Sequence, residues 1–180
     1  MGSEMALQAS LPTAESAYRA GAFALAMALF SIIVAHGFER FGGFAPCELC
    51  LMQRWAYYAG IPALFVSLVL YTMGHGKAAG FLFFAASLGF LANAGLGVYH
   101  SGVEWKFWPG PDTCSPPPGR MSTLGTGAGG VLGELGKTKV IRCDEAPWRM
   151  LGLSFAGWNV VLSFLIFTAA LQAAFGAVRR

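Results

Sequence analysis

Residues 78–99, AAGFLFFAASLGFLANAGLGVY, run without a single Asp, Glu, Lys or Arg. A helix needs about 20 mostly apolar residues to cross a hydrocarbon core about 30 Å thick, and this stretch meets that length. Residues 20–38, 55–73 and 150–178 also lack these charged residues. Four such stretches in 180 residues leave too little polar sequence to cover four buried helices. The sequence therefore predicts an all-α fold, an integral membrane four-helix bundle.

The composition of the chain supports the membrane assignment. Charged residues make up 12% of the chain, against about 25% in an average soluble protein. Hydrophobic residues reach 56%, and the mean hydropathy is +0.56. The formal net charge of +3 comes from scattered residues rather than from a Lys/Arg run. The sequence has no cluster of Lys and Arg residues of the kind that binds nucleic acid, so a nucleic-acid partner is excluded.

The connections between the apolar stretches differ greatly in length. Residues 1–180 are interpreted as one membrane domain. A short loop at about 39–50 joins the first two helices, and a long loop at about 100–149 precedes the last. The expected helices cover about residues 20–38, 51–73, 78–99 and 151–174.

All four cysteines fall in these two loops. Cys47 and Cys50 lie in the short loop, and Cys114 and Cys143 lie in the long one. Four spans place both termini on one side of the membrane and both cysteine-bearing loops on the other. Because disulfides persist in oxidising compartments, the loops are expected to be periplasmic, or extracytoplasmic in general, and the termini cytoplasmic. The counts of Lys and Arg do not decide this orientation, since the long loop is itself rich in basic residues.

The first cysteine pair lies in the segment PCELC, residues 46–50, where a membrane helix is expected to begin. Proline suits the first turn of a helix, and the positive end of the helix dipole favours the thiolate that does redox chemistry. Arg54 follows Cys50 by four residues, on the same helical face and near the membrane interface. It either stabilises negative charge on a thiolate or an acceptor oxygen, or anchors the helix by reaching toward lipid phosphates.

The Cys-x-x-Cys pair allows three interpretations. It could be half of a zinc site, but such a site needs two more ligands at suitable spacing. The other two cysteines are far apart and the three histidines are isolated, so no metal is predicted. The pair could also form an inert structural disulfide, or it could cycle between dithiol and disulfide.

A disulfide between Cys114 and Cys143 would close a loop rich in Pro and Gly. It would act either as a staple, worth about 3 kcal/mol for a loop of tens of residues, or as a relay that passes electrons by thiol–disulfide exchange. A relay needs a final electron acceptor, and no haem, dinucleotide or Fe–S motif occurs in the sequence. A lipid-soluble quinone fits best, because the first pair lies at the start of a membrane helix.

Several features occur together along about residues 20–175: four spans, a second cysteine pair in the last extracytoplasmic loop, and the motifs Pro46-Cys47-x-Leu49-Cys50-x-x-x-Arg54 and Gly152-Leu153 before Trp158. In this combination they resemble the DsbB family of disulfide-generating membrane enzymes. The stretches from His100 to Cys114 and from Arg142 to Trp148 resemble its alphaproteobacterial branch. Gln53 departs from a better-known branch, which has Glu before the arginine.

The resemblance implies a protein-dithiol:quinone oxidoreductase of the bacterial inner membrane. Cys47 and Cys50 would form the disulfide that is coupled to ubiquinone or menaquinone. Arg54 and His100 would lie at the quinone. These roles come from the family pattern and not from the spacing of the residues.

The resemblance further implies that Cys114 and Cys143 oxidise a DsbA-like periplasmic protein of thioredoxin fold, with Cys114 attacked first. Three alternatives stay open: a DsbB paralogue with a dedicated partner, a vitamin K epoxide reductase-like enzyme, and a non-catalytic membrane protein with structural disulfides. The second alternative would normally carry its active pair late in the chain, not before the second helix.

Small and polar residues inside the apolar stretches predict how the helices pack. Gly89, Gly95 and Gly97 indicate close approach between helices. Asn93 and Asn159 are expected to form hydrogen bonds between helices rather than to bind a ligand. None of the five is assigned to the site.

Overall fold

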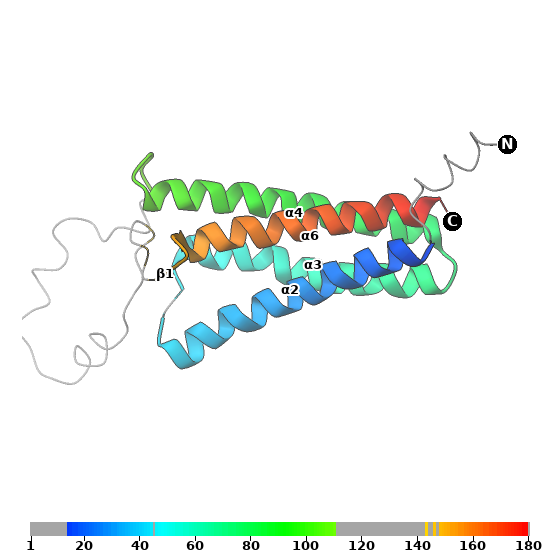
Figure 1. Cartoon of the computed structure of the whole chain (residues 1–180), viewed down its shortest axis with the longest axis horizontal. Coiled ribbons are helices and arrows are strands. Elements are labelled where there is room, and N and C mark those ends of the chain that lie inside the picture. The colour runs from blue at the N-terminus through cyan, green and yellow to red at the C-terminus, as the bar shows by residue number, and fades with distance from the viewer. Residues whose placement is uncertain (1–13, 45, 111–142, 144–145, 147, 180) are drawn as a thin grey trace, which may run out of the picture.

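The computed structural model of the chain describes residues 14–44, 46–110, 143, 146 and 148–179. Within these residues the fold consists of four long helices and one two-stranded hairpin (Figure 1). Each of the four helices is long and apolar enough to cross a membrane, which confirms the predicted all-α membrane bundle. The elements in chain order are α2 (Ala14–Gly42), α3 (Glu48–Thr72), α4 (Gly76–Glu104), β1 (Arg149–Met150), β2 (Leu153–Ser154) and α6 (Phe155–Val178).

The four helices lie side by side along one long axis (Figure 1). Helix α6 packs against both α4 and α2, and α3 packs mainly against α4. The C-terminal half of α2 diverges from α6 in the view of Figure 1. The α2–α3 connection, the end of α4 and the β1–β2 hairpin all lie at one end of the bundle. The described segments that flank both cysteine-bearing loops therefore lie at the same end of the bundle.

The helices extend beyond the expected ranges, and local chemistry explains where they begin. Helix α3 begins at Glu48 rather than residue 51, because Cys47 is its N-cap and the Cys47 sulfur accepts a hydrogen bond from the Cys50 N–H. Helices α2 and α4 continue to Gly42 and Glu104, several residues past the expected ends at 38 and 99. Polar residues at the ends of these helices lowered the hydropathy there without breaking the helix.

The last helix begins later than expected, at Phe155 rather than residue 151. Leu151 and Gly152 have φ of 54° and 83°, which is the backbone of a tight two-residue hairpin turn. This turn pairs β1 with β2, and a helix cannot continue through positive φ. The Ser154 hydroxyl then caps α6 by accepting a hydrogen bond from the Gly157 N–H at 3.2 Å.

Glycines on one face of α4 allow α6 to approach closely. A Cβ added at Gly80 would lie 2.5 Å from Val178 Cγ2, and one added at Gly97 would lie 2.8 Å from Val160 Cγ2. The prediction of close packing is therefore confirmed for Gly97. It is wrong for Gly89 and Gly95, where an added Cβ would meet nothing within 4 Å among the described residues. Those two glycines lie on the exposed face of the helix.

Polar side chains inside the bundle bond to one another across helices. The Tyr57 hydroxyl donates to Asn159 Oδ1 at 2.7 Å, and Asn93 Nδ2 donates to Ser163 Oγ at 2.9 Å. This network joins α3, α4 and α6 and confirms the interhelical role predicted for the two asparagines. Large apolar side chains cover the outer faces of the helices, as a lipid environment requires, among them Phe30, Phe65, Phe81 and Phe164.

Replacing Gly80 by leucine should destabilise the bundle by about 1–3 kcal/mol, because the new side chain overpacks the contact with Val178. Gly89→Leu is the matched control, since it adds the same side chain to the same helix on the open face. The thermal unfolding midpoint of each variant in detergent measures the effect. Equal midpoints for the two variants would show that α4 and α6 do not approach as described.

Candidate functional site

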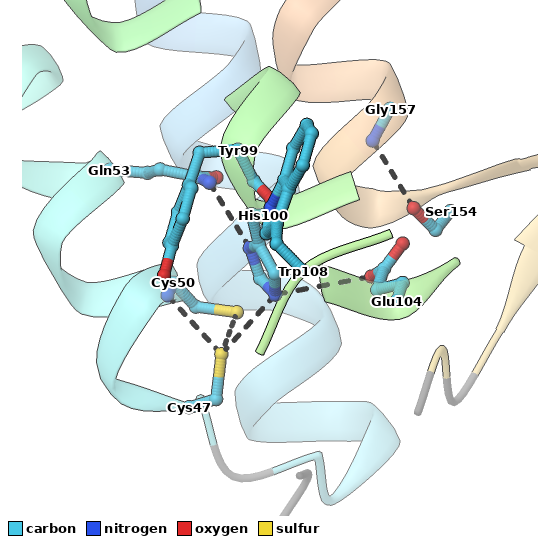
Figure 2. Close-up of polar contacts among 9 residues, drawn as sticks. All are labelled: Cys47, Cys50, Gln53, Tyr99, His100, Glu104, Trp108, Ser154 and Gly157. Atoms are coloured by element: carbon cyan, nitrogen blue, oxygen red, sulfur yellow. Dashed lines mark hydrogen bonds and ion pairs between the residues drawn. The ribbon is translucent and has the colours of Figure 1, made fainter. Parts of the chain in front are cut away.

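The two cysteines of the first loop form a close pair of thiols at the start of α3. Cys47 and Cys50 are free cysteines, and their sulfur atoms lie 2.8 Å apart (Figure 2). The Cys47 sulfur also accepts a hydrogen bond from the Cys50 N–H at 3.3 Å. Cys47 is buried, whereas Cys50 is partly exposed. The helix start therefore presents one enclosed and one more accessible sulfur within reach of a disulfide.

His100 lies beside the enclosed sulfur. Its Nε2 is 3.8 Å from the Cys47 sulfur, and its Nδ1 is 3.1 Å from the Nε2 of Gln53 (Figure 2). With the amide of Gln53 assigned as the donor, Nδ1 accepts and the ring proton sits on Nε2. That proton points at the sulfur and stabilises a thiolate there. The structure therefore places His100, which the sequence analysis expects at the quinone, beside Cys47. Gln53 contacts the other ring nitrogen.

The surroundings of Cys47 favour its thiolate form. The hydrogen bond from the Cys50 thiol is the largest cause, and it lowers the pKa of Cys47 to about 5 despite the opposing effect of burial. The hydrogen bond from His100 acts in the same direction. A thiolate at neutral pH is the species that attacks or leaves in disulfide exchange.

Arg54 lies on the same face of α3, one turn beyond Cys50, and reaches across to α2. Its Nη1 donates to Glu39 Oε2 at 2.5 Å, and the guanidinium side chain is only 12% exposed. Glu39 also lies 3.6 Å from Nδ1 of His36, whose Nε2 is 3.0 Å from the Tyr58 hydroxyl. Sequence reasoning did not select Glu39. The sequence did hold a signal for Glu39, because it is an acidic residue directly after the apolar stretch 20–38.

A cavity of about 380 Å³ lies beside the cysteine pair, lined by residues of α2, α3, α6 and the last turns of α4. Its walls are mostly apolar, and Trp148 closes one side by packing against Phe38 and Phe155 with ring centroids 5.3 and 5.1 Å apart. A volume of roughly 300–1,000 Å³ with a few convergent polar groups is typical of small-molecule sites. The polar side chains that line the cavity include Cys47, Cys50, Gln53, Arg54, His100 and Glu104.

Cys143 connects the long loop to this site. It is buried and disulfide-bonded, and it packs in the same apolar cluster as Cys47, Leu49 and Val103. Cys114, the remaining cysteine of the chain, lies outside the described residues. Three of the four predicted catalytic cysteines therefore gather at one end of the bundle.

Glu104 is a further site residue that sequence reasoning missed. It lies one turn beyond His100 on α4 and is only 8% exposed, with Oε1 4.0 Å from His100 Nε2. The signal in the sequence was the i, i+4 spacing of a histidine and a glutamate at the end of an apolar helix.

The segment after α4 folds back over this end, where Trp108 Nε1 donates to the carbonyl oxygen of Tyr99 at 2.8 Å.

The same donors lie close enough together to be compared with a metal centre. One ligand atom each from Cys47, Cys50 and His100 lie within 4.8 Å of one another. Two thiolates around one tetrahedral zinc ion, each at about 2.3 Å from the metal, would sit about 3.8 Å apart. The two sulfurs are 2.8 Å apart, so the arrangement fits a redox dithiol better than two zinc ligands. The absence of a metal stays a prediction.

Comparisons with known proteins agree on one family. The sequence matches the family model described as "Disulfide bond formation protein DsbB" over residues 18–173. It is 31% identical over 149 residues to Disulfide bond formation protein B of Xanthomonas oryzae pv. oryzae strain MAFF 311018, covering 76% of this chain and 78% of that protein. It is 29% identical over 141 residues to the protein of the same name from Aromatoleum aromaticum, covering 72% and 75%. No solved structure matches the chain significantly.

Alkylation of Cys47 by iodoacetamide should stay fast as the pH falls from about 8 to about 6 and slow only as it passes through about 5, because the thiolate is the reacting form. The measurement is the rate for each cysteine peptide in the reduced full-length protein in detergent. Cys50→Ala removes the largest cause of the low pKa, so its midpoint should move toward the value of about 8.5 of a free thiol. A wild-type midpoint already near that value would contradict the described site.

Proposed function

The chain belongs to the DsbB family of disulfide bond formation proteins, and from this membership and the site geometry we propose that it is a membrane protein-dithiol:quinone oxidoreductase. Membership makes it a membrane protein of the disulfide-forming pathway. The quinone acceptor, the partner protein and the roles of single residues are the proposal. Its physiological partner would be a DsbA-like periplasmic protein of thioredoxin fold.

The observation that supports the proposal most is that the two cysteine-bearing loops meet. Cys143 packs in the same buried cluster as Cys47, although 96 positions separate them in the sequence. A purely structural disulfide in the long loop has no need to lie against a free dithiol. Contact between the two pairs is the requirement for electron transfer by thiol–disulfide exchange.

The proposed route conserves electrons at each exchange. A thiolate of the partner attacks Cys114, and the bond to Cys143 breaks, which leaves a Cys143 thiolate beside Cys47. This thiolate attacks Cys47 of the oxidised first pair and releases Cys50. The second partner thiol and the Cys114 thiolate then resolve the two mixed disulfides. The result is an oxidised partner, a restored Cys114–Cys143 disulfide and a Cys47–Cys50 dithiol that holds two electrons.

The cavity beside the dithiol fits a quinone headgroup. It is mostly apolar, as a lipid-soluble ring requires, and Arg54 and His100 supply N–H donors for carbonyl oxygens. Arg54 would bind and orient the ring while keeping its ion pair with Glu39. A bound quinone would supply the electron sink by taking up two electrons and two protons. Bundle interiors commonly hold such cofactors between facing helices.

The proposal places the protein in the bacterial inner membrane, with the cysteine-bearing loops periplasmic and both termini cytoplasmic. Disulfide exchange with a secreted partner needs an oxidising compartment on the cysteine side. The start of α2 and the end of α6 lie together at the opposite end of the bundle from the cysteines (Figure 1), which is compatible with this orientation.

Anaerobic oxidation of a reduced thioredoxin-fold protein, with and without a water-soluble ubiquinone analogue, tests the function. We expect catalytic turnover only with the analogue, and at most about two equivalents of oxidation without it, one from each of the two disulfides of the fully oxidised enzyme. Trapping the thiols by alkylation should show Cys143 reduced in the arm without the analogue. A Cys143 that stays oxidised there would identify the long-loop disulfide as a staple and overturn the proposal.

Cys50→Ser should abolish turnover with the quinone analogue, because Cys47 then has no resolving sulfur at 2.8 Å. The variant should keep its helices, since Cys50 contributes its backbone N–H to the cap whatever the side chain. The measurements are the turnover rate and the circular dichroism of the purified protein. Full activity in this variant would remove the first pair from the reaction.

Arg54→Ala should raise the KM for the quinone analogue by about tenfold or more, as expected for loss of a hydrogen bond to a charged donor. Arg19→Ala is the matched control, because Arg19 lies near the start of α2 and its side chain is 78% exposed. Steady-state kinetics at saturating partner protein measures both. An unchanged KM in the Arg54 variant would leave this residue as an anchor of α3 to α2.

A further inference from the structure

The chain folds back directly after α4, in a segment of residues 105–109 that we name the aromatic turn. It follows Glu104, the last residue of the helix, and lies on the side away from α6 in the view of Figure 1. Trp108 Nε1 donates to the Tyr99 carbonyl oxygen at 2.8 Å, and the two rings are stacked with centroids 6.0 Å apart (Figure 2). The Tyr99 hydroxyl donates to the Pro109 carbonyl oxygen at 3.3 Å. These contacts fix the turn against the end of the helix.

A glycine of α4 makes room for the indole ring of Trp108. An added Cβ at Gly102 would clash with this ring, whereas one at Gly95 would meet nothing within 4 Å among the described residues. Tyr99, on which the ring stacks, lies about five helical turns beyond Phe81 and so on the same face of α4. Phe81 is one of the large apolar side chains on the outer surface of the bundle. The turn therefore lays its indole ring on the lipid-facing side of the helix.

The aromatic turn also closes the backbone of the helix end without water. The Lys106 N–H donates to the Val103 carbonyl oxygen at 3.0 Å. The Phe107 N–H donates to the Gly102 carbonyl oxygen at 2.9 Å. This is the Schellman pattern, which needs a residue of positive φ, and Lys106 has a φ of 61°. Because lipid offers no hydrogen bonds to the backbone, a helix end closed by its own chain is suited to the boundary of the hydrocarbon.

The length of α4 indicates the depth of the turn. The helix has 29 residues, which corresponds to about 43 Å at about 1.5 Å per residue. A bilayer with its headgroup regions is about 40–45 Å thick. The helix therefore reaches from one headgroup region to the other, and the turn at its end lies at headgroup level.

The side chains of the turn have the chemistry of a membrane interface. Trp105 is 52% exposed, Phe107 is 69% exposed and Trp108 is 40% exposed. Tryptophan is enriched at both surfaces of a bilayer, where its ring has an apolar body and a polar edge. Lys106 adds a cation that can reach lipid phosphates along its flexible stem and that suits the negative end of the helix dipole.

We propose that the aromatic turn is a membrane-interface anchor, with its three aromatic rings among the lipid headgroups and Lys106 reaching toward phosphate groups. The occupant is lipid rather than a docked protein, because the indole ring lies back along the lipid-facing side of α4. Tyr99, which the turn holds, directly precedes His100, and His100 lies at the Cys47 sulfur. The anchor therefore sets the depth of the redox pair in the membrane. It requires only that α4 spans the bilayer and is independent of the proposed thiol oxidase function.

Fluorine NMR of the full-length protein, labelled with 5-fluorotryptophan in phosphatidylcholine nanodiscs, tests the anchor. Trp105→Phe and Trp108→Phe variants assign the two signals of the turn. The probes are phospholipids that carry a nitroxide either near the headgroup or near the end of the acyl chain, at equal mole fractions. We expect the shallow nitroxide to broaden both signals at least about twofold more than the deep one, because interfacial rings lie near the headgroups.

A glycine pair tests whether the indole ring is seated as described. Gly102→Ala should move the fluorine signal of Trp108, because the added Cβ displaces the ring from its stacking on Tyr99. It should also weaken the broadening of that signal by the shallow nitroxide at least about twofold, as the ring leaves the lipid-facing side. Gly95→Ala is the matched control on the same helix and should change neither.

Two results with the wild-type protein would overturn the proposal. Signals that neither nitroxide broadens would show that the turn faces water or a docking partner. Broadening by the deep nitroxide that equals or exceeds the shallow one would place the rings in the hydrocarbon core. An unmoved Trp108 signal in a folded Gly102→Ala variant would also overturn it. The wild-type comparison decides even where that variant fails to fold, and a missing oxidase activity would leave all of these signals unaffected.

Discussion

The site depends on one local interaction, the hydrogen bond from the Cys50 N–H to the Cys47 sulfur. This bond makes Cys47 the N-cap of α3, so the sulfur lies where the helix has unsatisfied N–H donors and a positive end. A cysteine at a helix start gains thiolate character from the backbone alone. The same bond fixes the register of α3, which turns Gln53 toward His100 and Arg54 toward α2.

Packing between helices then brings distant residues to that helix start. The glycines of α4 allow this helix to pack closely against α6. The last turns of α4 place His100 and Glu104 near the two thiols. The hairpin before α6 closes the cavity with Trp148. Each contribution comes from a rigid helix end or tight turn, although the chemistry belongs to the loops.

Much of the architecture could be predicted from composition, because the hydrophobic thickness of a bilayer sets the length of each helix. The Cys47–Cys50 pair, Arg54 and the interhelical asparagines were also accessible, since their local spacing carries the information. Glu39 and Glu104 were not selected. The role of Glu39 depends on a contact between helices, which no spacing within one helix reveals. The position of Glu104 relative to His100 follows from their spacing in α4, but its burial depends on how the bundle packs. The late start of α6 was missed for a different reason, since the positive φ of Leu151 belongs to a residue that gives no turn signal.

The ion pair between Arg54 and Glu39 has a consequence for selectivity among membrane amphiphiles. A lone guanidinium facing this mostly apolar cavity would attract anionic amphiphiles such as fatty acids and acidic phospholipids. The guanidinium keeps its positive charge when Glu39 binds it, but the pair as a whole is close to neutral, and Arg54 still has N–H groups that can donate to an uncharged carbonyl. The pairing therefore disfavours anionic competitors electrostatically while leaving the hydrogen-bonding capacity of the cavity in place.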